Sequence, residues 1–202
     1  MKKTALLASL ALAGMLMATG AAQAQDACTA DPDEIFDLDD AAVNALYDCV
    51  RDRMAEGYAK SEDPVGSEYR SWTATATRPA VEGAHGERFL LTFANDVAAE
   101  QYLKFEEEGV QMPVGSVLAK ESFKVRTKGN NKGKLAVGPL FLMTKVGLDE
   151  APETAGWLYG GIQPNGKPMK FKQSFCHNCH TAWEAQDSLA YPVEDVRVST
   201  GG

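Results

Sequence analysis

The C-x-x-C-H motif from Cys176 to His180, near the end of the 202-residue chain, constrains the fold more than any other segment. Two cysteines three apart, followed directly by a histidine, form the attachment motif of a c-type haem. The thiols take thioether bonds to the porphyrin and the imidazole ligates the iron. If residues 172–186 are helical, Cys176, Cys179 and His180 project from one helix face. The sequence therefore predicts one covalently bound haem c on a C-terminal helix.

Zinc and dithiol sites are the rival interpretations of this motif. A structural zinc ion needs four ligands, and no second pair of cysteine and histidine residues lies near Cys176 in the sequence. A thioredoxin-like redox pair would open an early helix within a β-α-β unit, whereas this C-x-x-C comes last. Both remain as the less favoured alternatives to haem.

Residues 1–24 have the pattern of a secretory signal peptide. Lys2 and Lys3 form a basic start, residues 5–18 are almost wholly apolar, and residues 22–24 resemble a cleavage site. The apolar run is too short for a convincing transmembrane helix, and no later segment has eighteen uninterrupted apolar residues. We therefore expect a periplasmic protein without a membrane span.

The charge balance argues against one class of partner. The chain has 28 acidic and 20 basic residues, and without Lys2 and Lys3 the basic count falls to 18, a formal charge of −10. Binding to a phosphate backbone depends on clustered lysine and arginine, so no nucleic-acid partner is expected. A periplasmic redox partner, if the protein has one, would be basic.

Cys28 and Cys49 form a second pair of cysteines, outside the haem motif. In an oxidising compartment such a pair predicts a disulfide. It would close a loop of about twenty residues and contribute about 3 kcal/mol on the chain-entropy model. Two unrelated buried thiols are the alternative.

The hydrophobic pattern predicts an α+β fold, an antiparallel sheet of about five strands with flanking helices and a C-terminal haem-attachment helix. One helix is expected from Asp39 or Asp40 to Gly57, and another from Asn95 or Asp96 to Gly109. The strands are expected at residues 68–76, 88–94, 116–125, 135–146 and 156–162.

Five segments carry a family resemblance: Tyr69-Arg70-Ser71-Trp72, Phe93-Ala94-Asn95-Asp96 with Tyr102, Gly115-Ser116-Val117-Leu118-Ala119-Lys120-Glu121, Gly156-Trp157-Leu158-Tyr159, and the haem motif. They resemble the cytochrome P460 and cytochrome c′-β family of periplasmic proteins, in which C-x-x-C-H ends a largely antiparallel β domain. Together with the N-terminal pattern, this predicts a signal peptide in residues 1–24, an N-terminal loop and helix in residues 25–66, and a cytochrome P460-like haem c domain in residues 67–202. The resemblance also implies a homodimer.

The resemblance implies a five-coordinate haem with His180 as proximal ligand and an open distal face. Family members of the P460 type carry a lysine cross-linked to the porphyrin and oxidise hydroxylamine or nitric oxide. Members of the c′-β type lack the link and bind nitric oxide beneath a phenylalanine-rich cap. The cross-linking position falls at Lys104, or at Glu106 or Glu107 if the alignment shifts. A hydroxylamine or nitric oxide oxidoreductase and a non-catalytic electron-transfer or gas-sensing cytochrome both remain open.

The other site candidates surround the expected haem. The family's capping position falls near Gln111 and Met112, and Met112 could be a sixth ligand or a core residue. His85 could ligate the iron on the distal side or remain an exposed loop residue. Arg88 could donate a hydrogen bond to a bound ligand or lie in solvent. The candidates for packing against the macrocycle are Trp72, Trp157, Tyr159 and Phe175.

Overall fold

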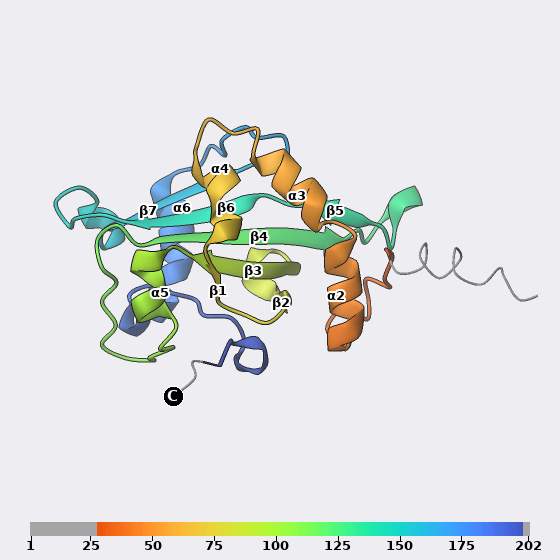
Figure 1. Ribbon diagram of the computed structural model, residues 1–202, viewed down its shortest axis with the longest axis horizontal. Coiled ribbons are helices and arrows are strands. Elements are labelled where there is room, and N and C mark those ends of the chain that lie inside the picture. The colour runs from red at the N-terminus through yellow and green to blue at the C-terminus, as the bar shows by residue number, and fades with distance from the viewer. Residues whose placement is uncertain (1–27, 200–202) are drawn as a thin grey trace, which may run out of the picture.

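The computed structural model describes residues 28–199, and an antiparallel sheet of seven strands forms its centre (Figure 1). The strands are β1 (Thr73–Ala74), β2 (Ala80–Glu82), β3 (Arg88–Ala94), β4 (Val117–Val125), β5 (Leu135–Val137), β6 (Leu140–Lys145) and β7 (Trp157–Ile162). The strand order is β1-β3-β4-β6-β7, with β2 paired to β3 and β5 paired to β4. The predicted α+β class is confirmed. The predicted signal peptide lies outside the described residues.

Within residues 28–199 five α-helices surround the sheet: α2 (Asp40–Asp48), α3 (Arg51–Tyr58), α4 (Val65–Glu68), α5 (Asp96–Tyr102) and α6 (Gln173–His180). The side chains of Asp39 and Asn95 accept hydrogen bonds from backbone N–H groups in the first turns of α2 and α5, so both predicted caps are confirmed. Within residues 28–199 no helix is long and apolar enough to span a membrane.

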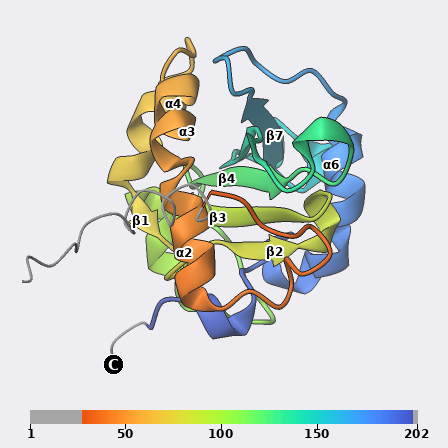
Figure 2. The ribbon, with the colours of Figure 1, turned by 90° about the vertical axis from the view of Figure 1, so that its right-hand side faces the viewer.

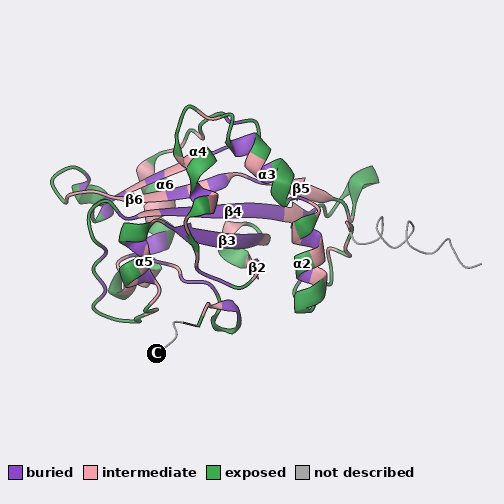
Figure 3. Cartoon of the chain, viewed as in Figure 1, coloured by how far each residue is buried: buried purple, intermediate pink, exposed green. Residues whose placement is uncertain are grey.

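The sheet separates two hydrophobic cores. Figure 2 shows α2, α3 and α4 on one side of the sheet and α6 on the other. The first core includes Met54 and Tyr58 of α3 and Phe123 of β4. The second includes Tyr102 of α5 and Trp157 of β7. The central strands β3 and β4 are therefore covered on both faces and are buried along most of their length (Figure 3).

The structure differs from the predicted elements where long-range contacts decide the backbone conformation. The predicted strand over residues 68–76 forms only the two residues of β1, because Tyr69–Ser71 is a 3₁₀ turn that sends the Tyr69 side chain into the first core. The strand predicted over residues 135–146 is split into β5 and β6 at Gly138 and Pro139, since proline has no N–H for the ladder.

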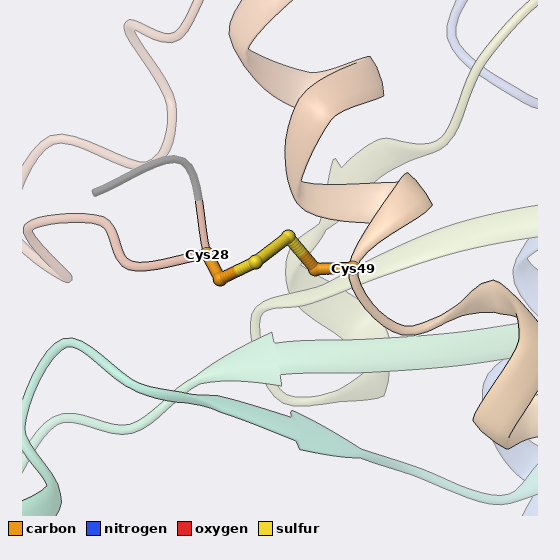
Figure 4. Close-up of a disulfide and its surroundings, with 2 residues drawn as sticks. All are labelled: Cys28 and Cys49. Carbon is orange, nitrogen blue, oxygen red and sulfur yellow. A yellow bond between two sulfur atoms is a disulfide. The ribbon is translucent and has the colours of Figure 1, made fainter. Parts of the chain in front are cut away.

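The helix predicted up to Gly57 is also divided. It forms α2 and α3, and the break falls at Cys49 and Val50. Cys49 forms the predicted disulfide with Cys28, with the Cα atoms 5.7 Å apart (Figure 4). The disulfide is confirmed, and it ties the start of the described chain to the end of α2.

Removal of this disulfide is expected to lower the free energy of unfolding by about 3 kcal/mol, because the bond restricts a loop of 21 residues in the unfolded chain. The measurement compares urea denaturation of the wild type with that of a Cys28→Ser/Cys49→Ser double variant. Reductant should lower the wild-type midpoint and leave that of the variant unchanged. Equal midpoints for oxidised wild type and variant would contradict the prediction.

Candidate functional site

A cavity of about 500 Å³ lies between α6, one face of the sheet at β3, β4, β6 and β7, and the 3₁₀ turn Gly83–His85. Its volume is within the usual range for small-molecule and cofactor sites. Most of its wall is apolar, including Leu118, Phe141, Met143, Met169, Phe171 and Leu189. Such a wall suits a large planar ligand with few polar groups.

Helix α6 places the three residues of the haem motif on the cavity wall. Cys176, Cys179 and His180 stand at positions i, i+3 and i+4 of the helix, and all three line the cavity. Both cysteines are free thiols. Burial, with a contribution from Cys179, raises the pKa of the Cys176 thiol, so this group is the neutral thiol at neutral pH. The donor set fits a covalently attached haem c.

A hydrogen bond fixes the tautomer of His180. Its Nδ1 lies 2.8 Å from the carbonyl oxygen of Ser188. Because a carbonyl oxygen only accepts hydrogen bonds, Nδ1 carries the hydrogen and Nε2 keeps the lone pair. Burial lowers the pKa of His180 against the opposing effect of this hydrogen bond, so the imidazole is neutral at neutral pH. A neutral imidazole with a free Nε2 is the form that ligates a metal.

The loop that presents this carbonyl is held in a rare conformation. Asp187 and Ser188 have φ angles of 54° and 63°, in the left-handed region that residues other than glycine seldom occupy. The Asp187 carboxylate accepts from Lys145 Nζ at 2.7 Å and from the Met112 N–H at 2.8 Å. The indole Nε1 of Trp157 donates to the Asp187 carbonyl at 2.8 Å. These contacts hold the loop in place and with it the acceptor of the imidazole N–H.

The side chains of Glu82, His85 and Lys120, which come from outside α6, also line the cavity. Lys120 Nζ lies 3.6 Å from Glu82 Oε2, and both side chains are mostly buried. The His85 ring packs against Phe141 with 4.6 Å between ring centroids. Burial, together with the positive charge of Lys120, lowers the pKa of His85 to about 3, so its imidazole is neutral at neutral pH.

Of the four predicted distal residues, only His85 lines the cavity. The Arg88 guanidinium lies beside Gly138, away from the cavity lining. Gln111 is exposed. Met112 is buried in the second core, among the residues that cover α5. The interpretation of Met112 as a core residue is therefore the one that its position supports.

The structure places Lys104 outside the cavity. It follows the end of α5, is exposed, and donates a hydrogen bond to Gln101 Oε1 at 2.9 Å. The face of α5 that turns inward carries Ala98 and Tyr102 instead. Lys120 of β4 is the lysine that the cavity contains.

Two of the four predicted packing residues line the cavity, Tyr159 and Phe175. The Tyr159 ring lies 5.2 Å from that of His180, centroid to centroid. Trp157 is fully buried in the second core, where its indole contacts the loop at residue 187. Trp72 packs against the first core, on the opposite face of the sheet.

Sequence reasoning missed Lys120 and Glu82, although the signal for Lys120 was present. In a strand buried on both faces, alternate residues belong to opposite sides. In β4 this puts Leu118 and Lys120 on the cavity face, and Ala119 and Glu121 on the face toward α2 and α3. A buried lysine in such a strand points into a site or an ion pair.

Comparison with known proteins gives one match. A family model described as Cytochrome P460 matches residues 66–190, which include the sheet, most of the cavity lining and the complete C-x-x-C-H motif. Nothing matches among the curated proteins that were compared.

Proposed function

The chain belongs to the cytochrome P460 family, and on that basis we propose that it is an exported mono-haem c cytochrome acting on small nitrogen species. Haem is attached through Cys176 and Cys179, and His180 is the proximal ligand. One observation carries the proposal: α6 presents two free thiols and a neutral imidazole to an apolar cavity of about 500 Å³. The bound haem supplies an iron centre for ligand binding and electron exchange.

The substrate class proposed is nitric oxide or hydroxylamine. A small ligand fits a cavity that haem largely fills, and the apolar wall excludes bulk water from it. Glu82 Oε2 is a carboxylate oxygen on the cavity wall, able to take a proton from a nitrogen ligand. This group supports oxidation chemistry more than simple storage of a gas.

A cross-link between protein and haem, which the family resemblance implies for P460-type members, is proposed at Lys120 and no longer at Lys104. Lys120 is mostly buried on the cavity wall, whereas Lys104 is exposed outside it. A second candidate function is electron transfer without catalysis, with a basic periplasmic partner. The observation that favours it is the position of His85, which faces His180 across the cavity. Periplasmic export and a homodimer remain predictions.

The haem assignment predicts one haem c per chain in protein matured in a host with a haem c maturation system. The pyridine haemochrome spectrum identifies haem c, and the haem should stay on the chain after denaturation. A Cys176→Ser/Cys179→Ser variant should lose this covalent haem, because no thioether can form. The matched control is Cys28→Ser/Cys49→Ser, which removes the other two cysteines and should keep the haem.

Addition of nitric oxide or hydroxylamine to the haem-loaded protein should change its absorption spectrum. A colourless, zinc-containing product would overturn the haem assignment. A haem protein whose spectrum responds to neither compound would leave haem c in place and overturn the substrate class.

A further inference from the structure

Two imidazole rings lie near each other at the cavity. His180 extends from α6, and His85 extends from the 3₁₀ turn between β2 and β3, 95 positions earlier in the chain. The ring centroids are 6.4 Å apart, with an angle of 78° between the ring planes. Both side chains line the same cavity, so they approach it from different elements of the fold.

This separation matches the geometry of two imidazoles on one metal ion. A metal–imidazole nitrogen bond is about 2.0 Å, and the nitrogen lies roughly 1.1 Å from the centre of its ring. Two rings on opposite sides of one metal ion therefore have centroids about 6.2 Å apart. The observed separation of His85 and His180 agrees with this value within a few tenths of an ångström.

We infer that His85 is the sixth ligand of the haem iron in the resting protein, opposite His180. The inference rests on the proposed haem c assignment. The family resemblance implies an open distal face. In this inference the distal face is instead closed by His85, a residue of the chain itself.

The surroundings of His85 leave its ring free to act as a ligand. Within residues 28–199, neither of its ring nitrogens has a hydrogen-bond partner, whereas His180 is held by Ser188 and His177 Nδ1 lies 3.2 Å from Tyr159 Oη. Contact with Phe141 orients the ring.

The cavity contains other potential ligands. Lys120 Nζ is engaged with Glu82 Oε2 at 3.6 Å. Met143 and Met169 line the cavity with thioether sulfurs that are able to ligate haem iron. Of the side chains around the cavity, His85 combines an imidazole nitrogen with a position facing His180.

A bound His85 must leave before an external ligand can reach the iron. The turn that carries it is suited to such movement, because Gly83 and Gly86 flank the histidine and are exposed. If the histidine-bound form makes up 90–99% of the resting protein, the apparent affinity for an external ligand falls by about 10- to 100-fold. Ligand access is then controlled by a short turn at the surface.

The test is the spin state of the haem-loaded protein, measured by absorption and electron paramagnetic resonance. The wild type should be low-spin, with the near-infrared charge-transfer band of a bis-histidine haem. His85→Ala should be high-spin, and added imidazole should restore the low-spin spectrum. Nitric oxide should bind to His85→Ala at least about tenfold faster than to the wild type, since no internal ligand has to dissociate.

Glu87→Ala is the matched control, because it changes an exposed residue of the same turn and keeps His85. It should leave the spin state unchanged. A high-spin wild type, or a low-spin spectrum that persists in His85→Ala, would overturn the inference. Both results would leave the haem c assignment intact, whereas a protein without haem c would show that the proposed function itself has failed.

Discussion

Replacement of Glu121 by alanine is expected to lower the free energy of unfolding by about 3–5 kcal/mol, the range seen when one partner of a buried ion pair is removed. Glu121 is 1% exposed in the first core. Arg70 Nε and Nη2 donate to its Oε1 at 2.8 and 2.6 Å, and Tyr69 Oη donates to the same oxygen. Tyr47 Oη donates to Oε2 at 2.7 Å. Alanine would leave all these donors without their acceptor.

The tyrosines make this loss larger. Burial and then the nearby carboxylate raise the pKa of both Tyr47 and Tyr69, so both hydroxyls remain protonated donors. Each of these two hydroxyls, left without an acceptor, should lower the free energy of unfolding by about 1–3 kcal/mol. Arg70 is partly exposed and recovers some hydration, which reduces its share of the total.

Urea denaturation of Glu121→Ala, Glu121→Gln and Lys124→Ala provides the measurement. Glu121→Gln should lower the free energy of unfolding by less than Glu121→Ala does. The glutamine amide keeps one acceptor oxygen but turns an N–H₂ group toward one of the donors. Lys124 is on the same strand and only half-buried, so its alanine variant should change stability by less than about 1 kcal/mol. A Glu121→Ala protein as stable as the Lys124→Ala protein would show that the network contributes little.

Replacement of Asp187 by asparagine is expected to lower the free energy of unfolding by about 3–5 kcal/mol and to raise the reduction potential of the bound haem. Asp187 and Lys145 are paired at 2.7 Å with side chains only 12% and 11% exposed. The carboxylate accepts from the lysine on one oxygen and from the Met112 N–H on the other. An amide would have to present its N–H₂ group to one of these two donors.

The potential should change because Asp187 holds the loop that carries the Ser188 carbonyl. If the loop moves, the hydrogen bond to His180 Nδ1 weakens and the imidazole becomes a less basic ligand. A less basic ligand stabilises oxidised iron less, so the potential rises. Glu184→Ala, an exposed change near the same loop, is the control and should alter neither quantity. A loss of stability with no change in potential would limit Asp187 to a structural role.

Local patterns in the sequence predicted the elements whose contacts are local. The C-x-x-C-H helix, the caps at Asp39 and Asn95, and the strands around β3 and β7 all follow from short-range spacing. The disulfide followed from the cysteine count. The fold class was predictable for the same reason, because the hydrophobic periodicity of each segment indicates whether it forms a helix or a strand.

The parts that sequence reasoning missed depend on contacts between distant residues. Tyr69 looks like a strand residue and becomes part of a 3₁₀ turn because its hydroxyl bonds to Glu121, 52 positions later. For His85 the sequence left a distal ligand and an exposed turn residue both open, and only its packing on Phe141 shows that it lies at the cavity. Lys104 was the position that the family resemblance implied for the cross-link, and the structure places its side chain outside the cavity.

The alternation of side chains between the two faces of β4 also favours one register of strand pairing over the others. Neighbouring side chains of opposite charge, Lys120 and Glu121, point to opposite faces of this strand. A slip of one residue in the pairing would exchange the two faces. The Glu121 carboxylate would then lie near Glu82, and the Lys120 ammonium group would lie near Arg70. Both pairs carry like charges, so both contacts would be repulsive. Charge repulsion on both faces of the sheet therefore disfavours a one-residue slip in the pairing of β4.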